Sequence, residues 1–255
     1  MNRPSEVSAA GRGKPVLCLL PGLLCDASVW APQRRAFEGD YEVVVPSFFG
    51  LDSLEAMARL TLDMAGEGPI SVAGHSMGGR VALEVFRLAP ERLARLALLD
   101  TGAHGAGPDE AERRQDLIDA CRSEGMEALV RLWLPPMVHP DRLGDTALME
   151  PMARMIRGAS PDIYEGQVRA LLERPDATDY LPRLRCPTAV ICGRQDAWSP
   201  FARHVEMAAA IPGSVLTAIE DSGHMTTLER PEAVTAALRA WLAMPAALEP
   251  GGQPA

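Results

Sequence analysis

The chain has 255 residues, 47% of them hydrophobic and 23% charged, so a single packed domain accounts for its length. Its formal charge of −9 argues against a surface that binds nucleic acid or anionic membranes, because both need clustered lysines and arginines. No apolar run approaches the roughly 18 residues of a membrane span.

Apolar runs of five to seven residues alternate with helical patterns, which is typical of βαβ units and a mostly parallel sheet. The runs predict strands at Val16–Leu20, Tyr41–Val45, Ile70–Gly74, Leu93–Leu99, Thr188–Cys192 and Val215–Ile219. Helices are predicted at about Trp30–Phe37, Leu54–Ala65, Met77–Leu88, Pro200–Ala210 and Pro231–Leu242. We therefore expect an α/β fold with a doubly wound sheet.

Residues 103–185 break this alternation, because they carry helical patterns and no convincing strand. The helices are predicted at roughly Asp109–Ser123, Met126–Trp133, Arg142–Arg157 and Pro161–Leu172. We interpret the segment as a helical cap inserted into a core of residues 15–102 and 186–244, since ligands of open α/β sheets bind at the carboxyl ends of strands. The alternative is a helical layer with no role in substrate binding. Residues 1–14 and 245–255 are expected to form a flexible arm and tail.

The strongest local signal is Gly74-His75-Ser76-Met77-Gly78-Gly79, a G-x-S-x-G motif between a predicted strand and a predicted helix. A serine on so sharp a turn needs a strained backbone and small neighbours two positions away on either side. Gly74 and Gly78 meet that need. Ser76 is the candidate nucleophile, and the N–H of Met77, at the start of the helix, can stabilise an oxyanion.

On this motif and the order of its elements the chain resembles the α/β-hydrolase superfamily, over about residues 15–242. The motif looks like that of small esterases, lactonases, haloperoxidase-like hydrolases and C–C bond hydrolases. The resemblance implies an α/β-hydrolase fold and the chain order nucleophile, acid, histidine.

A serine hydroxyl needs a base to take its proton, and His224 is the best candidate among five histidines. It lies in Asp221-Ser222-Gly223-His224, between the last predicted strand and the last helix, and the family carries its histidine in a similar Gly-His context. His75 is expected to point away from Ser76, and His204 to begin a surface helix.

Asp196, just after the strand that ends at Cys192, resembles the acid of the family, which holds the tautomer of the histidine. Asp100, at the end of the strand Leu93–Leu99, is the alternative, because some members draw their acid from that position.

The second oxyanion donor is expected from the loop after the first strand, Leu20-Pro21-Gly22-Leu23-Leu24. We favour Leu23 over Leu24. The family usually has His-Gly where this chain has Pro21-Gly22. Leu24, Trp133 and Trp198 are the candidate substrate-binding residues, of a pocket expected to be apolar.

These residues predict a serine hydrolase that cleaves a carboxylic ester, lactone or thioester of a small molecule through an acyl-enzyme. Two alternatives are a lyase or C–C hydrolase using the same three residues, and a non-catalytic ligand-binding homologue. No dinucleotide fingerprint or metal spacing is present, so neither cofactor nor metal is expected. Five scattered cysteines with no disulfide or zinc pattern suggest a reducing, cytoplasmic compartment. The oligomeric state cannot be read from the sequence.

Overall fold

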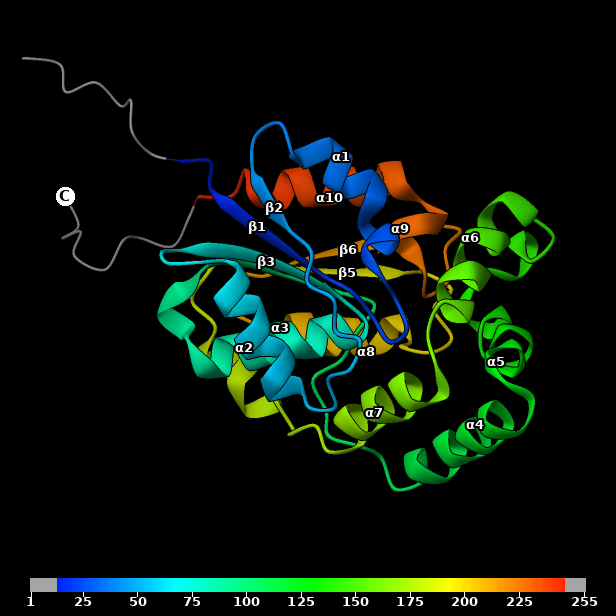
Figure 1. Ribbon diagram of the computed structural model, residues 1–255. Coiled ribbons are helices and arrows are strands. Elements are labelled where there is room, and N and C mark those ends of the chain that lie inside the picture. The colour runs from blue at the N-terminus through cyan, green and yellow to red at the C-terminus, as the bar shows by residue number, and fades with distance from the viewer. Residues whose placement is uncertain (1–12, 246–255) are drawn as a thin grey trace, which may run out of the picture.

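A six-stranded sheet forms the centre of the computed structural model, which describes residues 13–245 (Figure 1). Its strands are β1 (Val16–Leu20), β2 (Glu42–Val44), β3 (Ile70–His75), β4 (Leu93–Leu99), β5 (Thr188–Gly193) and β6 (Val215–Ile219). They lie in the order β2-β1-β3-β4-β5-β6, and every pairing between them is parallel. Except for residues 13, 14 and 245, the predicted arm and tail lie outside the described residues.

The inner strands are apolar because helices cover both faces of the sheet. Every residue of β3 and β5 is buried, whereas the edge strand β6 exposes nearly half of Val215. The register pairs Leu20 with Gly74 and His75 with Leu99, so the strands end close to one another along a single edge. Side chains in the loops after these strands can therefore converge.

Helices cover both faces of the sheet (Figure 1). One face carries α1 (Ala31–Phe37) and α10 (Pro231–Leu242), which contact each other. The opposite face carries α2 (Leu54–Met64), α3 (Met77–Leu88) and α8 (Phe201–Ala210). The predicted doubly wound parallel sheet is thus confirmed, with element boundaries within about two residues of those expected.

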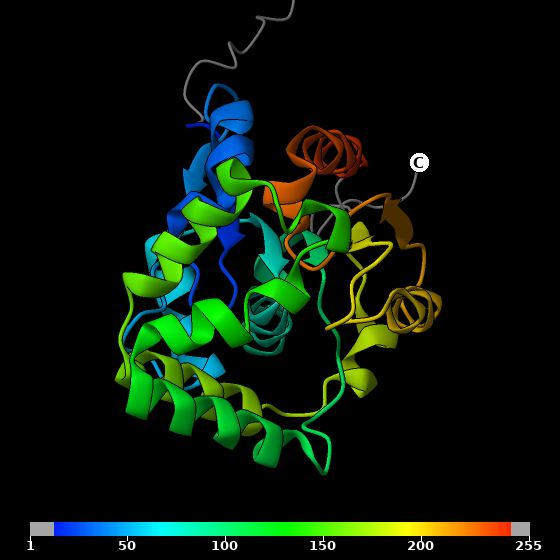
Figure 2. The same cartoon turned by 90° about the vertical axis from the view of Figure 1, so that its right-hand side faces the viewer.

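The chain between β4 and β5 forms four further helices and no strand, as expected. They are α4 (Glu110–Glu124), α5 (Met126–Leu132), α6 (Thr146–Arg157) and α7 (Pro161–Leu172). Figures 1 and 2 place this α4–α7 segment on the side toward which the strands run. The expected start of α6 at Arg142 is wrong: Pro140–Arg142 forms a separate turn, and the Asp145 side chain caps the helix by accepting the Leu148 N–H at 3.1 Å.

A short helix, α9 (Thr226–Glu229), precedes α10 and was not expected from the sequence. Among the described helices none is both long and apolar enough to cross a membrane.

Candidate active site

Ser76 occupies the junction between β3 and α3 with a backbone φ of 56° and ψ of −117°. This is a conformation that non-glycine residues rarely adopt. A Cβ placed on Gly74 would lie 2.2 Å from the Gly78 carbonyl oxygen, and one placed on Gly78 would lie 2.2 Å from that of Leu20. Only glycine at both positions therefore lets strand and helix approach closely enough to hold Ser76 on the turn.

His224 links Ser76 to Asp196 by two hydrogen bonds. Its Nε2 lies 2.8 Å from Ser76 Oγ, and its Nδ1 lies 2.8 Å from Asp196 Oδ2. Because the carboxylate can only accept, Nδ1 carries the proton and Nε2 accepts from the serine hydroxyl. Burial by itself lowers the pKa of His224, but the charge and hydrogen bond of Asp196 outweigh it, and the net pKa is raised.

Asp196 and Asp100 are both buried, and their bonding differs. The second oxygen of Asp196 accepts the N–H groups of Trp198 and Ser199, each at 2.8 Å. Asp100 instead accepts the Gly193 N–H at 2.9 Å and the Thr226 hydroxyl. Burial, followed by the neighbouring charge of Asp196, raises the pKa of Asp100 well above its usual range. The structure thus brings Asp196, and not Asp100, to His224.

Asp100, Asp196 and Cys192 also place potential metal-ligand atoms within 4.8 Å of one another. The oxygens of both carboxyl groups are already engaged by Gly193, Thr226, Trp198, Ser199 and His224. Burial, the largest influence, also raises the pKa of the Cys192 thiol, whereas metals bind thiolates. This cluster fits a hydrogen-bonded support for the histidine better than it fits a metal ion.

The expected oxyanion donors differ in availability. Within residues 13–245 the N–H groups of Leu23 and Met77 have no hydrogen-bond acceptor, and both residues line the cavity that contains Ser76. Leu24 has φ of 58°, and its N–H donates to Gln167 Oε1 at 2.8 Å. This N–H is therefore not available to an oxyanion. Gly22 lies so close that a Cβ there would come within 3.2 Å of Ser76 Cβ, which keeps this loop beside the serine despite its Pro-Gly sequence.

The Ser76 cavity has a volume of about 390 Å³ and lies between the sheet edge and the α4–α7 segment. Trp133 and Trp198 line it, Trp133 buried and Trp198 42% exposed. Leu24 is buried outside its wall. The expectation of an apolar lining is wrong: besides leucines, methionines and tryptophans it contains Arg80, Arg113, Arg114, Arg174, Arg203 and Glu110.

The chain also matches a known protein family. A family model described as "Alpha/beta hydrolase family" matches residues 16–237. The chain belongs to the alpha/beta hydrolase family.

Three relatives illustrate the likeness of this alpha/beta hydrolase to known proteins. The chain is 34% identical to a thermophilic esterase from Thermogutta terrifontis, with a TM-score of 0.80 over 91% of this chain and 90% of that one. It is 26% identical to the (E)-2-((N-methylformamido)methylene)succinate hydrolase of Acinetobacter baylyi, over 94% of this chain and 95% of that protein. It is 27% identical to the polyketide synthase ThaQ of Burkholderia thailandensis, over 93% of this chain but only 12% of that much longer protein.

Three groups in this alpha/beta hydrolase hold the backbone around His224, and sequence reasoning missed them. The carbonyl of His224 accepts from His75 Nε2 at 2.8 Å, and its N–H donates to the Met137 carbonyl at 2.7 Å. Burial, then the charge of His224, lowers the pKa of His75 to about 4, so His75 is neutral. Buried Glu229 accepts the N–H groups of Gly223 and Met225. Glu229 is close to His224 in the chain, but His75 and Met137 are distant from it, so the sequence carries no signal for their contacts.

The expected surface position of His204 is wrong. His204 is fully buried, and its Nε2 accepts the Thr101 N–H at 2.9 Å, next to the Ser76 turn. Met207, three residues further along α8, is buried on the same face, whereas Val205 is exposed. The helical spacing of His204 and Met207 is the signal that could have shown which face of α8 packs on the sheet.

Proposed function

We propose that this alpha/beta hydrolase cleaves a carboxylic ester, lactone or thioester of a small molecule, with Ser76, His224 and Asp196 as its catalytic residues. The single observation that carries the proposal is the hydrogen-bonded chain from Ser76 Oγ through the His224 ring to Asp196, with 2.8 Å at each link. It opens into the cavity of about 390 Å³. Relatives named an esterase and a hydrolase of a succinate derivative support hydrolysis as the reaction class.

In the first half-reaction His224 Nε2 takes the proton of Ser76 as Oγ attacks the carbonyl carbon. The oxyanion that forms accepts hydrogen bonds from the N–H groups of Leu23 and Met77, which have no other acceptor among the described residues. His224 then gives its proton to the departing alkoxide or thiolate. The product of this half-reaction is an acyl-enzyme on Ser76.

In the second half-reaction a water molecule takes the place of the leaving group. His224 removes its proton, the hydroxide attacks the acyl carbon, and the proton returns to Ser76 Oγ as the acid leaves. Asp196 holds the Nδ1–H and stabilises the imidazolium in both halves. No cofactor is required at any step.

Residues 103–185 act in this proposal as a cap that closes the pocket over Ser76. Support comes from the cavity wall, to which α4 contributes Arg113, Arg114 and Leu117 and α7 contributes Leu171. Trp133 follows α5 and lies against Tyr164 of α7, with ring centroids 6.5 Å apart. A small substrate is consistent with a cavity near the lower end of the usual range, roughly 300–1,000 Å³.

The test is turnover of short-chain 4-nitrophenyl esters together with labelling by a fluorophosphonate probe. Ser76→Ala should abolish both, while Ser123→Ala, on the exposed surface of α4, should match the wild type. Full activity of Ser76→Ala would refute the proposal. Labelling of the wild type at Ser76 without turnover of any ester or thioester would favour the alternative of a lyase or C–C hydrolase. Ligand binding with neither labelling nor turnover would favour a non-catalytic homologue.

A further inference from the structure

Five arginines surround the Ser76 cavity, in a chain whose formal charge is −9. They come from four separate parts of the fold: α3, α4, the loop after α7, and α8. They are Arg80, Arg113, Arg114, Arg174 and Arg203. Local sequence charge therefore does not explain the cluster, which exists only because the fold brings these segments together.

One carboxylate in the cavity wall neutralises part of this charge. Glu110 accepts from Arg174 at 2.6 Å and from Arg114 at 2.8 Å. Burial on its own would raise the pKa of Glu110, but the bonds and charges of Arg174 and Arg114 lower it to about 2. Glu110 is therefore ionised at neutral pH, and its charge is shared between two of the five arginines.

The other three arginines have no such partner. Within residues 13–245 no carboxylate forms an ion pair with Arg80, Arg113 or Arg203. Arg80 is half-buried, and its Nη1 donates to the His104 carbonyl at 2.5 Å. Burial, and then the charge of Arg174, lowers the pKa of Arg80 to about 9, and Arg203 acts in the same direction. Glu110 and Asp176 offset the charge at Arg80 in part. The wall still carries five arginines against two carboxyl groups, Glu110 and Asp100, so it presents an excess of positive charge to a ligand.

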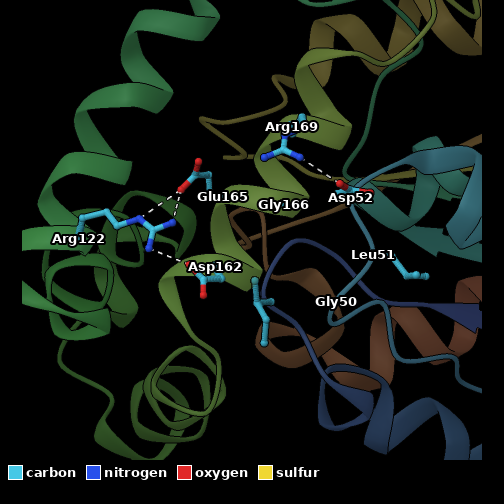
Figure 3. A pocket seen from close by; sticks show the side chains of 9 residues that line it. Gly50, Leu51, Asp52, Arg122, Asp162, Glu165, Gly166 and Arg169 are labelled. Atoms are coloured by element: carbon cyan, nitrogen blue, oxygen red, sulfur yellow. Dashed lines mark hydrogen bonds and ion pairs between the residues drawn. The ribbon is translucent and has the colours of Figure 1, made fainter.

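A second cavity of the molecule shows that an excess of positive charge is not a general property of its cavities. The cavity between the loop at Gly50 and α7 has a volume of about 360 Å³ and also contains two arginines (Figure 3). There Arg122 is bonded to Asp162 and Glu165, and Arg169 to Asp52. Three carboxylates therefore face two arginines in that wall, so it presents no excess of positive charge to a ligand.

The position of Arg80 relates the excess charge to the reaction. Arg80 lies in the first turn of α3, four residues after Ser76, and both residues line the cavity. Arg203 enters from α8 and influences the pKa of Arg80 through its charge. An anionic group held by these arginines would therefore lie within a small-molecule length of the carbon that Ser76 attacks.

We propose that Arg80 and Arg203, backed by Arg174, bind an anionic group of the substrate, so that the substrate is an ester or thioester carrying a carboxylate or a phosphate. The inference rests on the proposed function and narrows its substrate class. A carboxylate suits the planar fork of a guanidinium as well as a phosphate does, since both accept two parallel hydrogen bonds. The cavity volume favours a compact carboxylate over a large phosphate-bearing carrier.

The test compares substrates that differ only in the anion. One pair is mono-4-nitrophenyl adipate against 4-nitrophenyl hexanoate, and the other is S-acetyl-4′-phosphopantetheine against S-acetylpantetheine. We expect kcat/KM to favour the anionic member of the first pair by more than about tenfold, the effect of one charge-assisted contact. Preference in the second pair instead would identify phosphate as the anion recognised. A ratio of one or less in both pairs would overturn the proposal.

Variants connect the preference to the arginines. Arg203→Gln, whose side chain is exposed, should reduce the anionic-to-neutral ratio about tenfold through a higher KM for the anionic ester alone. Arg80→Gln should do the same, with its fold checked by thermal unfolding. Arg154→Gln removes an exposed arginine from α6, outside the cavity wall, and should leave the ratio unchanged. A ratio in Arg203→Gln equal to that of the wild type would overturn the assignment.

Calorimetric titration of the free protein with succinate and with inorganic phosphate separates this inference from the proposed function. Binding that weakens about tenfold in Arg203→Gln, and not in Arg154→Gln, upholds the anion site even if no ester is hydrolysed. No binding of either anion at low salt, together with normal ester turnover, overturns the anion site and leaves the proposed function standing.

Discussion

Glu229 holds both sides of His224, because one oxygen of its carboxylate accepts the Gly223 N–H at 3.0 Å and the Met225 N–H at 3.2 Å. Its other oxygen accepts the His139 N–H at 2.8 Å from the α4–α7 segment. The Glu229 side chain is buried, so these hydrogen bonds hold the loop that carries His224 in place. Glu229 is thus a positioning residue for the proposed base.

Glu229→Gln should lower kcat about tenfold, because the amide has one acceptor oxygen where the carboxylate has two. It should also move the acidic limb of the pH profile of kcat/KM to lower pH, since the negative charge of Glu229 helps to raise the pKa of His224. Both changes are measured with one ester over a range of pH. A lower kcat with no shift of the acidic limb of the pH profile would mean that Glu229 has a structural role alone.

The pH dependence of the wild type follows from the raised pKa of His224. His224 accepts a proton only when neutral, so kcat/KM should rise with pH through a midpoint above the ordinary histidine value of about 6.5. In Asp196→Asn the main group that raises the pKa is gone while burial stays, so the midpoint should fall. The same variant should lose about 10³- to 10⁴-fold in kcat, because the amide no longer holds the required tautomer.

Asp100→Asn should behave differently from Asp196→Asn. Burial and the charge of Asp196 raise the pKa of Asp100, which favours its neutral form, and asparagine is a neutral side chain of nearly the same shape with one acceptor and one donor group. The amide oxygen can accept the Gly193 N–H, and the amide nitrogen can donate to the Thr226 hydroxyl. We expect kcat within a few-fold of wild type. A loss as large as that of Asp196→Asn would make Asp100 the acid.

Gly78→Ala should destabilise the fold by about 3 kcal/mol, because the new methyl group would meet the Leu20 and Pro21 carbonyls, which are rigid backbone. The free energy of unfolding is measured by denaturant titration. Gly39→Ala is the matched control, since a Cβ there meets nothing within 4 Å. Equal stability of the two variants would show that strand and helix can separate without cost.

Much of the fold could be predicted because the signals are local. The strand Leu93–Leu99 and the helix Met77–Leu88 follow from apolar runs and helical spacing that act over a few residues. Ser76, Asp196 and His224 each follow a predicted parallel strand, so their meeting at one sheet edge could be expected in advance. Their catalytic roles, and those of Leu23 and Met77, stay predictions.

The arginine cluster could not be predicted, because it depends on how distant segments pack. Arg113 and Arg203 lie at exposed helical positions, where an arginine is ordinarily a solvated surface residue. Only Arg80 carried a local signal, its spacing of four residues from Ser76. The apolar pocket expected from Trp133 and Trp198 was wrong for the same reason: those residues do line the wall, but charged residues from other elements line it too.

The hydrogen bond from the His224 N–H to the Met137 carbonyl makes the α4–α7 segment part of the support of the histidine loop. A carbon on Gly223 would come within 2.7 Å of that same carbonyl, so the two chains touch backbone to backbone. Exchange of residues 103–185 for the corresponding segment of a relative would thus alter reactivity as well as substrate choice. A chimera intended to change selectivity alone has to keep residues 137–139 from this chain and begin the exchange on either side of them.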